Sequence, residues 1–143
     1  MIYLISATPR TRSTLLCHLL ENSGVAGLPG EYFSHDGSRN FSEHLNSCIR
    51  DGVGGVSIMY KMMLFLKGEF DVTAFDKYIW MRRENKLEQA ISFIKADKTE
   101  QFELLEGETP VDTSEIDPPS NLEIFNTTGR WVVSDLLWEL FFQ

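Results

Sequence analysis

The sequence predicts an α/β domain with a mainly parallel sheet. Short apolar runs alternate along the chain with segments in which apolar residues recur every three or four positions. A short apolar run without helical spacing is typical of a buried strand, whereas the recurring pattern is typical of a helix. Strands that alternate with helices indicate a parallel sheet, because a helix returns the chain so that the next strand runs in the same direction.

The chain opens with a strand, a polar loop and a helix. The strand is predicted over residues 2–7 (IYLISA), and Pro9 ends it. A polar turn over residues 10–14 leads into the helix, which is expected to end near Gly24 in a left-handed stop. The helical spacing comes from Leu15, Leu16, Leu19 and Leu20.

The remaining elements continue this alternation. Residues 40–50 are predicted as a short helix and residues 56–63 as a second strand. Residues 78–81 are predicted as a third buried strand, and Asn85 is placed to cap the helix after it. The chain ends in a predicted helix over residues 131–143. Its broad apolar face contains Val132, Leu136, Leu137, Leu140 and Phe141.

Length and composition fit a single domain over residues 1–143. Of the 143 residues, 43% are hydrophobic, which is enough to bury a core. The formal net charge is −8, and residues 100–129 hold eight of the 21 acidic residues and none of the 13 Lys and Arg. Prolines and weak periodicity indicate that most of this acidic stretch is a surface loop. The chain lacks the broad basic surface that a nucleic-acid partner requires.

The sequence also indicates where the protein is located in the cell and whether it binds a metal. No apolar run approaches the roughly eighteen residues that span a membrane, and the first residues lack a signal-peptide pattern. Cys17 and Cys48 form neither a disulfide framework nor a zinc spacing. No ligand pattern is visible around His18, His35 and His44. We therefore expect a cytoplasmic protein without a metal or a membrane partner.

The first loop is a candidate anion site. A loop that leads into a helix N-terminus attracts anions through free N–H groups and the positive end of the helix dipole. Arg10 and Arg12 add charge here, and Ser13 and Thr14 add hydroxyl donors. The alternative is a capped helix with incidental surface arginines. The loop lacks the lysine of a Walker-type motif, which disfavours a kinase or NTPase.

Two further candidates lie downstream. Arg82 and Arg83 follow the third predicted strand, ahead of a helix that carries Ser92. Ligands of open parallel sheets bind beyond the carboxyl ends of the strands, so a ligand with two charged ends would meet both basic groups. The alternative is a pair of solvated arginines. Glu31 is a surface carboxylate on position alone, but beside an anion pocket it is suited to be a general base, with His35 as a second candidate.

These segments occur together in one family. In chain order they read ATPRTRSTLLCHLL, GVAGLPGEYF, GVSIMYKMM, YIWMRRENKLEQAIS and, more weakly, WELFF. With them the chain resembles the PAPS-dependent sulfotransferases, in particular the bacterial branch that includes trehalose 2-sulfotransferase. The resemblance covers most of residues 1–95 and implies a P-loop NTPase-like three-layer fold.

The resemblance implies a role for each loop residue. The first loop becomes the 5′-phosphosulfate loop, which holds the 5′-phosphate and the sulfate that is transferred. Its residues are Arg10, Thr11, Arg12, Ser13 and Thr14. The family usually carries glycine at the position of Arg12, so this side chain either adds a catalytic contact to the sulfate or blocks the approach.

The implied co-substrate is 3′-phosphoadenosine 5′-phosphosulfate (PAPS), and no metal is required. Arg83 and Ser92 would hold its 3′-phosphate, with Arg82 as the alternative because neighbouring strand residues face opposite sides. Glu31 matches the position proposed as the base in this branch. The implied reaction transfers a sulfuryl group from PAPS to a hydroxyl of a carbohydrate or small metabolite.

Family members continue beyond the position of Gln143 into another strand and further helices, so we expect a C-terminally short, truncated member. The apolar face of the last helix would then be buried by self-association, as in a homodimer. The alternative function is a catalytically inactive sulfotransferase fold that acts as a binding or interaction module.

Overall fold

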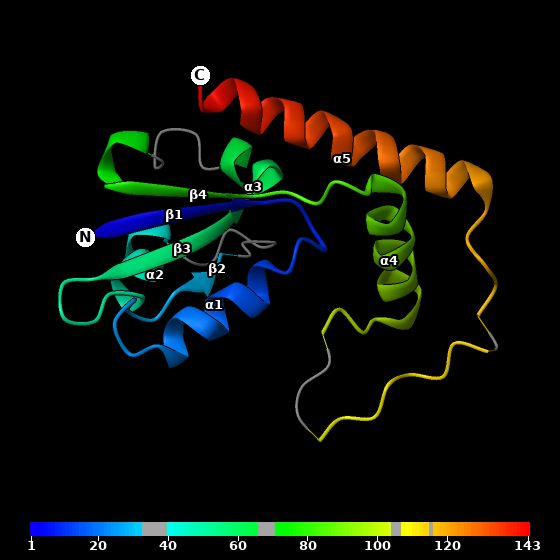
Figure 1. Cartoon of the computed structure of the whole chain (residues 1–143), viewed down its shortest axis with the longest axis horizontal. Coiled ribbons are helices and arrows are strands. Elements are labelled where there is room, and N and C mark those ends of the chain that lie inside the picture. Colours follow the sequence, from blue (N-terminus) through cyan, green and yellow to red (C-terminus); the bar gives the residue numbers. More distant parts are fainter. Residues whose placement is uncertain (33–39, 66–70, 104–106, 115) are drawn as a thin grey trace. The chain divides into compact units, whose positions relative to one another are not determined.

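The computed structural model describes residues 1–32, 40–65, 71–103, 107–114 and 116–143 (Figure 1). These residues form two compact units. The first comprises Met1–Arg82 together with Ser134–Gln143, and the second comprises Arg83–Val133. The single domain expected over residues 1–143 stays a prediction.

The first unit is built on a four-stranded sheet in which all strands are parallel, which confirms the predicted α/β class. The strands are β1 (Ile2–Ala7), β2 (Gly30–Glu31), β3 (Gly54–Met59) and β4 (Lys77–Met81), in the order β2-β3-β1-β4. Ser6 of β1 pairs with Ile58 of β3 on one side and with Trp80 of β4 on the other. From β1, the strands β3 and β2 lie on one side of the sheet and β4 lies on the other. In open parallel sheets, ligands bind beyond the carboxyl ends of the strands at the point where the strand order reverses in this way.

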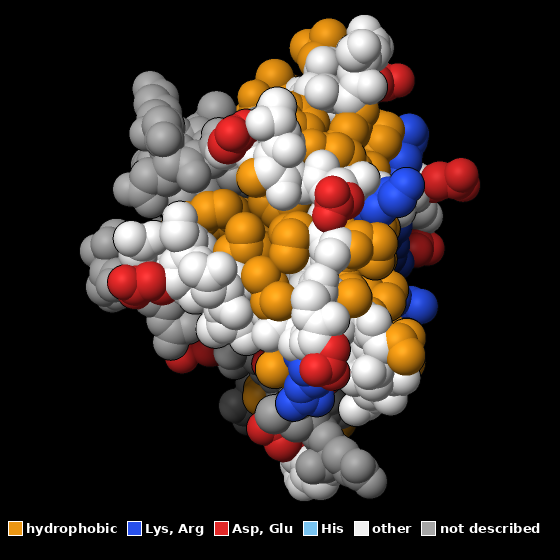
Figure 2. Space-filling model, turned by 90° about the vertical axis from the view of Figure 1, so that its left-hand side faces the viewer, with side chains coloured by type: hydrophobic (Ala, Val, Ile, Leu, Met, Phe, Trp, Pro, Cys, Tyr) orange, Lys and Arg blue, Asp and Glu red, His pale blue; other side chains and the backbone are white. Residues whose placement is uncertain are grey.

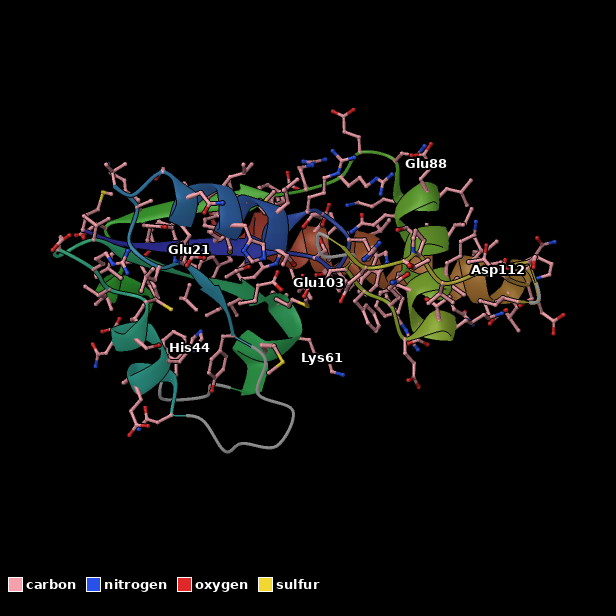
Figure 3. All side chains as sticks on the ribbon, turned by 90° about the horizontal axis from the view of Figure 1, so that it is seen from below. Glu21, His44, Lys61, Glu88, Glu103 and Asp112 are labelled. Carbon is pink, nitrogen blue, oxygen red and sulfur yellow. The ribbon has the colours of Figure 1, made fainter. Side chains whose placement is uncertain are left out.

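Helices cover both faces of this sheet. α1 (Ser13–Asn22) packs on one face, where its Cys17 joins Ile5 of β1 in the core. Among the described residues of 1–82, the other helices are α2 (Phe41–Ser47), α3 (Tyr60–Phe65) and the one-turn η1 (Val72–Ala74). α2 and α3 lie on the opposite face from α1, as Figure 3 shows, and contribute Phe41 and Met62 to a second apolar cluster.

The last part of α5 (Asn121–Phe141) completes the first unit. Trp138 is fully buried, and its ring lies edge to face with Tyr60 of α3, with the centroids 5.5 Å apart. The apolar face predicted for this helix is divided. Leu137 and Phe141 are half-buried, whereas Val132, Leu136 and Leu140 are exposed. Self-association through the exposed side chains stays a prediction.

Apolar side chains also gather where the strands begin. Figure 2 views the side of the molecule at which β1 and β4 start, and it shows a broad hydrophobic patch there. Met1, the first residue before β1, is 55% exposed. This patch lies at the opposite end of β1 from Ala7. Within the described residues, no helix is long and apolar enough to cross a membrane.

Two boundaries differ from the sequence prediction. The strand expected over residues 56–63 ends at Met59, and α3 begins at Tyr60. The apolar run continues from the strand into the helix, so composition alone does not mark the change. The final helix begins at Asn121 instead of near residue 131, so residues 121–129 are helical and the loop prediction is wrong for them.

A pair of side chains explains the early start of α5. The Glu123 backbone N–H donates to Ser120 Oγ over 3.2 Å, and the Ser120 N–H donates to Glu123 Oε2 over 2.7 Å. This reciprocal pair is a capping box, which satisfies two backbone donors at the helix start. Hydrogen bonds from Ser120, and then from Lys98, hold the pKa of the Glu123 carboxyl below its usual value.

The second unit contains α4 (Lys86–Thr99) and the first part of α5. Asn85 caps α4 as predicted, because its side-chain oxygen accepts a hydrogen bond of 3.0 Å from the Glu88 N–H. Phe93 of α4 and Trp131 of α5 pack edge to face, with ring centroids 5.1 Å apart. These contacts join the two helices within the unit.

Removal of the capping box is expected to destabilise α5. Ser120→Ala should lower the free energy of unfolding by about 1 kcal/mol, because the N-cap hydroxyl is lost. The effect of Glu123→Gln should depend on pH. Because the folded-state pKa is lowered, the carboxylate stabilises fully above the unfolded-state pKa and this contribution disappears as the pH falls through the folded-state value.

Urea unfolding followed by circular dichroism, at neutral pH and in acid, measures both effects. Ser120→Thr keeps the hydroxyl and is the matched control. If the free energy of unfolding fell as much in Ser120→Thr as in Ser120→Ala, the assignment of Ser120 as the N-cap would be contradicted.

Candidate functional site

The loop between β1 and α1 has a strained backbone. Arg10 and Arg12 have φ angles of 66° and 69°, in the left-handed region that favours glycine. A side chain in this region costs about 1–2 kcal/mol per residue, because Cβ crowds the following carbonyl oxygen. Such a conformation persists only where the surrounding structure holds it. The left-handed backbone at Arg12 also fits the glycine that is usual there in the family that the sequence resembles.

Hydrogen bonds from within the loop and from α5 hold this segment. Thr11 Oγ1 donates to the Thr8 carbonyl over 2.8 Å, and Thr8 Oγ1 donates to Asp135 Oδ1 over 2.9 Å. Trp138 Nε1 donates to the Ala7 carbonyl over 3.3 Å. The site residues predicted from the sequence do not include Thr8, Asp135 or Trp138. The weak match of the WELFF segment, which begins at Trp138, is the one sequence signal near them.

The start of α1 is open to an outside acceptor. Its N-cap is Arg12, which makes no side-chain hydrogen bond to the first turn. Asn40 and Asn85, by contrast, cap α2 and α4 through their side-chain oxygens. An arginine has no acceptor to offer, so the N–H donors and the positive dipole end of α1 are available to an anion. This geometry supports the predicted anion loop.

Ser13 and Glu31 meet beside that helix start. Ser13 is the first residue of α1 and is buried, and its Oγ donates to Glu31 Oε1 over 2.6 Å. Glu31 ends β2 and is half-buried, in register with Ser57 of β3. The structure thus joins a predicted donor-binding residue and the predicted base, which lie eighteen positions apart in the sequence.

Cys17 lies one turn further along α1. Burial, followed by the negative charges of Glu31 and other groups, raises the pKa of this thiol to about 12. Because the thiolate is the reactive form, Cys17 is not a nucleophile at neutral pH. The Glu31 carboxylate remains the candidate for acid–base chemistry at this end of α1.

The other loop residues differ in exposure. Arg12 is exposed, Arg10 and Thr14 are half-buried, and Thr11 is buried. The hydroxyl hydrogen of Thr11 is used on the loop's own carbonyl, so its side chain can only accept a hydrogen bond from a ligand. The guanidinium of Arg12 and the hydroxyl of Thr14 can therefore donate to an anion, whereas the hydroxyl hydrogen of Ser13 is donated to Glu31.

Arg82 and Arg83 both follow β4, which ends at Met81. The strand alternation that made Arg82 an alternative to Arg83 therefore does not apply to them. The Arg82 guanidinium lies over the Trp80 ring, 5.2 Å from its centroid. Arg83 NH2 lies 2.9 Å from Glu88 Oε2 within the second unit.

Ser92 is half-buried on α4 and belongs to the same unit as Arg83. A 3′-phosphate site that includes both residues stays a prediction.

The histidines do not assemble a site among the described residues. His18 is exposed, with Nδ1 4.0 Å from Glu21 Oε2 of the same helix. His44 lies on α2, on the other side of the strands from Glu21, as Figure 3 shows. His35 lies outside the described residues. Within the described part of the chain, no group of three His, Cys, Asp or Glu residues is arranged to hold a metal ion.

A comparison with known protein families bears on the first part of the chain. Residues 2–64 match the family model of Stf0 sulphotransferase. The match supports a sulfotransferase family, and the parallel sheet agrees with a P-loop-like fold. The match includes the loop and Glu31, and it ends before Arg83 and Ser92. No curated protein matches the chain.

The strain at Arg12 leads to a test of the loop geometry. Arg12→Gly should raise the free energy of unfolding by about 0.5–1 kcal/mol, because glycine adopts a positive φ without crowding its Cβ. Urea unfolding measures the change. Lys95→Gly, at an exposed position inside α4, is the control. Its free energy of unfolding should fall by about 1 kcal/mol, because glycine is unfavourable inside a helix. Destabilisation of both variants would mean that Arg12 is not strained.

Proposed function

We propose that the chain is a sulfotransferase that moves a sulfuryl group from PAPS to a hydroxyl of a carbohydrate or small metabolite. One observation carries the proposal: Ser13 Oγ donates to Glu31 Oε1 over 2.6 Å, at the uncapped start of α1. A carboxylate that can accept a proton thus lies beside a loop suited to an anion. The match of residues 2–64 to Stf0 sulphotransferase supports the same reading.

The loop binds the reacting end of the donor. The first-turn N–H groups of α1 and the side chains of Arg10, Arg12, Ser13 and Thr14 bind the 5′-phosphate and the sulfate. As the acceptor oxygen attacks sulfur, the bond to the bridging oxygen breaks and negative charge develops on the departing phosphate. Donors fixed in advance around that charge lower the barrier, because they need no reorganisation during the reaction.

Glu31 takes the acceptor's proton as the new oxygen–sulfur bond forms. Glu31 accepts a hydrogen bond from Ser13. In the proposed donor complex, only the Ser13 hydroxyl would separate this carboxylate from the sulfate, and the carboxylate would direct the acceptor hydroxyl toward sulfur. In the donor complex the Ser13 hydroxyl hydrogen is donated either to Glu31 or to a sulfate oxygen. The departing group is adenosine 3′,5′-bisphosphate (PAP), which retains the electron pair of the broken bond.

Arg83, together with Ser92, binds the 3′-phosphate that distinguishes PAPS from other adenine nucleotides. In the structure, Arg83 NH2 forms an ion pair with Glu88 Oε2 at 2.9 Å. The 3′-phosphate would therefore compete with a carboxylate for this guanidinium. A phosphate carries more charge and more acceptor oxygens than a carboxylate, so the exchange is favourable.

The second candidate is an inactive sulfotransferase fold that binds an anionic ligand without transfer. The exposed Arg12 side chain at a position where the family usually has glycine favours this candidate, because it can obstruct the donor. A homodimer formed through the exposed residues of α5 is compatible with either function.

Glu31→Gln separates the two candidates. The variant should bind PAP with nearly unchanged affinity and lose transfer by about 100-fold or more, because the amide still accepts from Ser13 but cannot take a proton. Calorimetric titration with PAP and transfer of radiolabelled sulfate from PAPS to a panel of sugars provide the readouts. Glu43→Gln, at an exposed position on α2, is the control. Turnover of Glu31→Gln at the wild-type rate would exclude Glu31 as the base.

The Arg83–Glu88 pair makes a further prediction about donor binding. Glu88→Gln should tighten PAP binding about twofold to fivefold, because the competing carboxylate is removed from a partly exposed pair. Arg83→Ala should weaken PAP binding while binding of 5′-AMP stays the same. Titration with both nucleotides tests this, with Arg50→Ala as the control. If Arg83→Ala bound PAP as well as the wild type does, the 3′-phosphate would have to lie elsewhere.

A further inference from the structure

We propose that Asp135 and Trp138 of α5 are positioning residues for the donor-binding loop. The two residues are spaced by three positions, so they share one face of the helix. Together they hold the end of β1, through Thr8 Oγ1 at 2.9 Å from Asp135 Oδ1 and through the Ala7 carbonyl at 3.3 Å from Trp138 Nε1. We call this pair the α5 clamp.

The α5 clamp fixes the loop through a chain of hydrogen bonds. Thr8 donates its hydroxyl hydrogen to Asp135, and its carbonyl accepts from Thr11 Oγ1 over 2.8 Å. Both neighbours of Thr11 have left-handed backbones. A backbone of this kind relaxes unless the structure around it is fixed. The α5 clamp supplies that constraint from outside the loop and so aims the N–H groups at the start of α1.

The chemistry of Asp135 also points to orientation rather than packing. The residue is only 8% exposed, and Thr8 is 1% exposed. Burial of a carboxylate is unfavourable unless specific partners compensate it, and an apolar side chain would fill this position at lower cost. A carboxylate accepts only, so it forces the Thr8 hydroxyl hydrogen toward α5. The direction of the Thr8 side chain is thereby defined.

Thr8→Val and Asp135→Ala test the α5 clamp in the full-length chain. The first readout is amide hydrogen exchange of residues 10–14, which needs no ligand. Both variants should exchange faster in this segment by about tenfold or more, as expected for the loss of a hydrogen bond to a charged group. Thr8→Ser keeps the hydroxyl and should restore wild-type exchange. Phe75→Leu, in the buried cluster on the α2 and α3 face, is the control for lost stability.

The second readout is PAP affinity by calorimetry, and this part rests on the proposed function. Thr8→Val and Asp135→Ala should each weaken PAP binding. The double variant should bind PAP no more weakly than the weaker of the two single variants, because both substitutions remove the same contact. Phe75→Leu should bind PAP normally. If the wild type bound no PAP, the proposed function would fail, while hydrogen exchange would still decide whether the loop is positioned.

Two results would overturn the α5 clamp. One is loop exchange in Thr8→Val and Asp135→Ala that matches Phe75→Leu at equal stability, since the contact would then contribute to packing alone. The other is faster loop exchange with unchanged PAP affinity in a protein that binds PAP. In that case the hydrogen bonds would stiffen the loop without positioning the ligand.

Discussion

The hydrogen bond between Thr8 and Asp135 is the contact on which the rest of the candidate site depends. It connects the end of the central strand to a helix 127 positions away, inside a buried environment. After Thr8, the backbone adopts the left-handed conformation at Arg10 and at Arg12 before α1 begins. The direction of the first helical N–H groups, the location of Ser13 and hence the approach of Glu31 all follow from that path.

The site combines two demands that oppose each other. An anion loop attracts negative charge, whereas Glu31 brings a carboxylate to the same helix start through Ser13. A negative charge beside a bound anion is unfavourable unless the reaction uses it, and proton abstraction from an acceptor uses it. Ser13 separates the two charges, because its hydroxyl can interact with either. In the proposed function, the same side chain therefore serves donor binding and acceptor chemistry.

Features encoded by neighbouring residues were predictable from the sequence. The apolar run of β1, the leucine spacing of α1 and the Asn85 cap of α4 depend on residues within a few positions of one another. The capping box of Ser120 and Glu123 was equally local. The prolines and acidic residues around it favoured a loop, and so the true start of α5 was missed.

Contacts between distant residues account for the other differences. β2 has only two residues and exists through its pairing with β3, which no periodicity can indicate. The resemblance implied separate roles for Ser13 and Glu31, but it did not predict the hydrogen bond between them. Nothing in the order of residues connects Thr8 with Asp135. The candidate loop could be located from the sequence, but the groups that shape it could not.

The separation between Thr8 and Asp135 has a consequence for how the protein is made. A ribosome adds about 5–20 residues per second, so Thr8 is synthesised on the order of ten seconds before its partner exists. The strands and α1 can assemble during that interval, yet the loop stays free to sample other backbones. The candidate loop is therefore among the first segments to be translated, but the contact that constrains it forms only after α5 has been made.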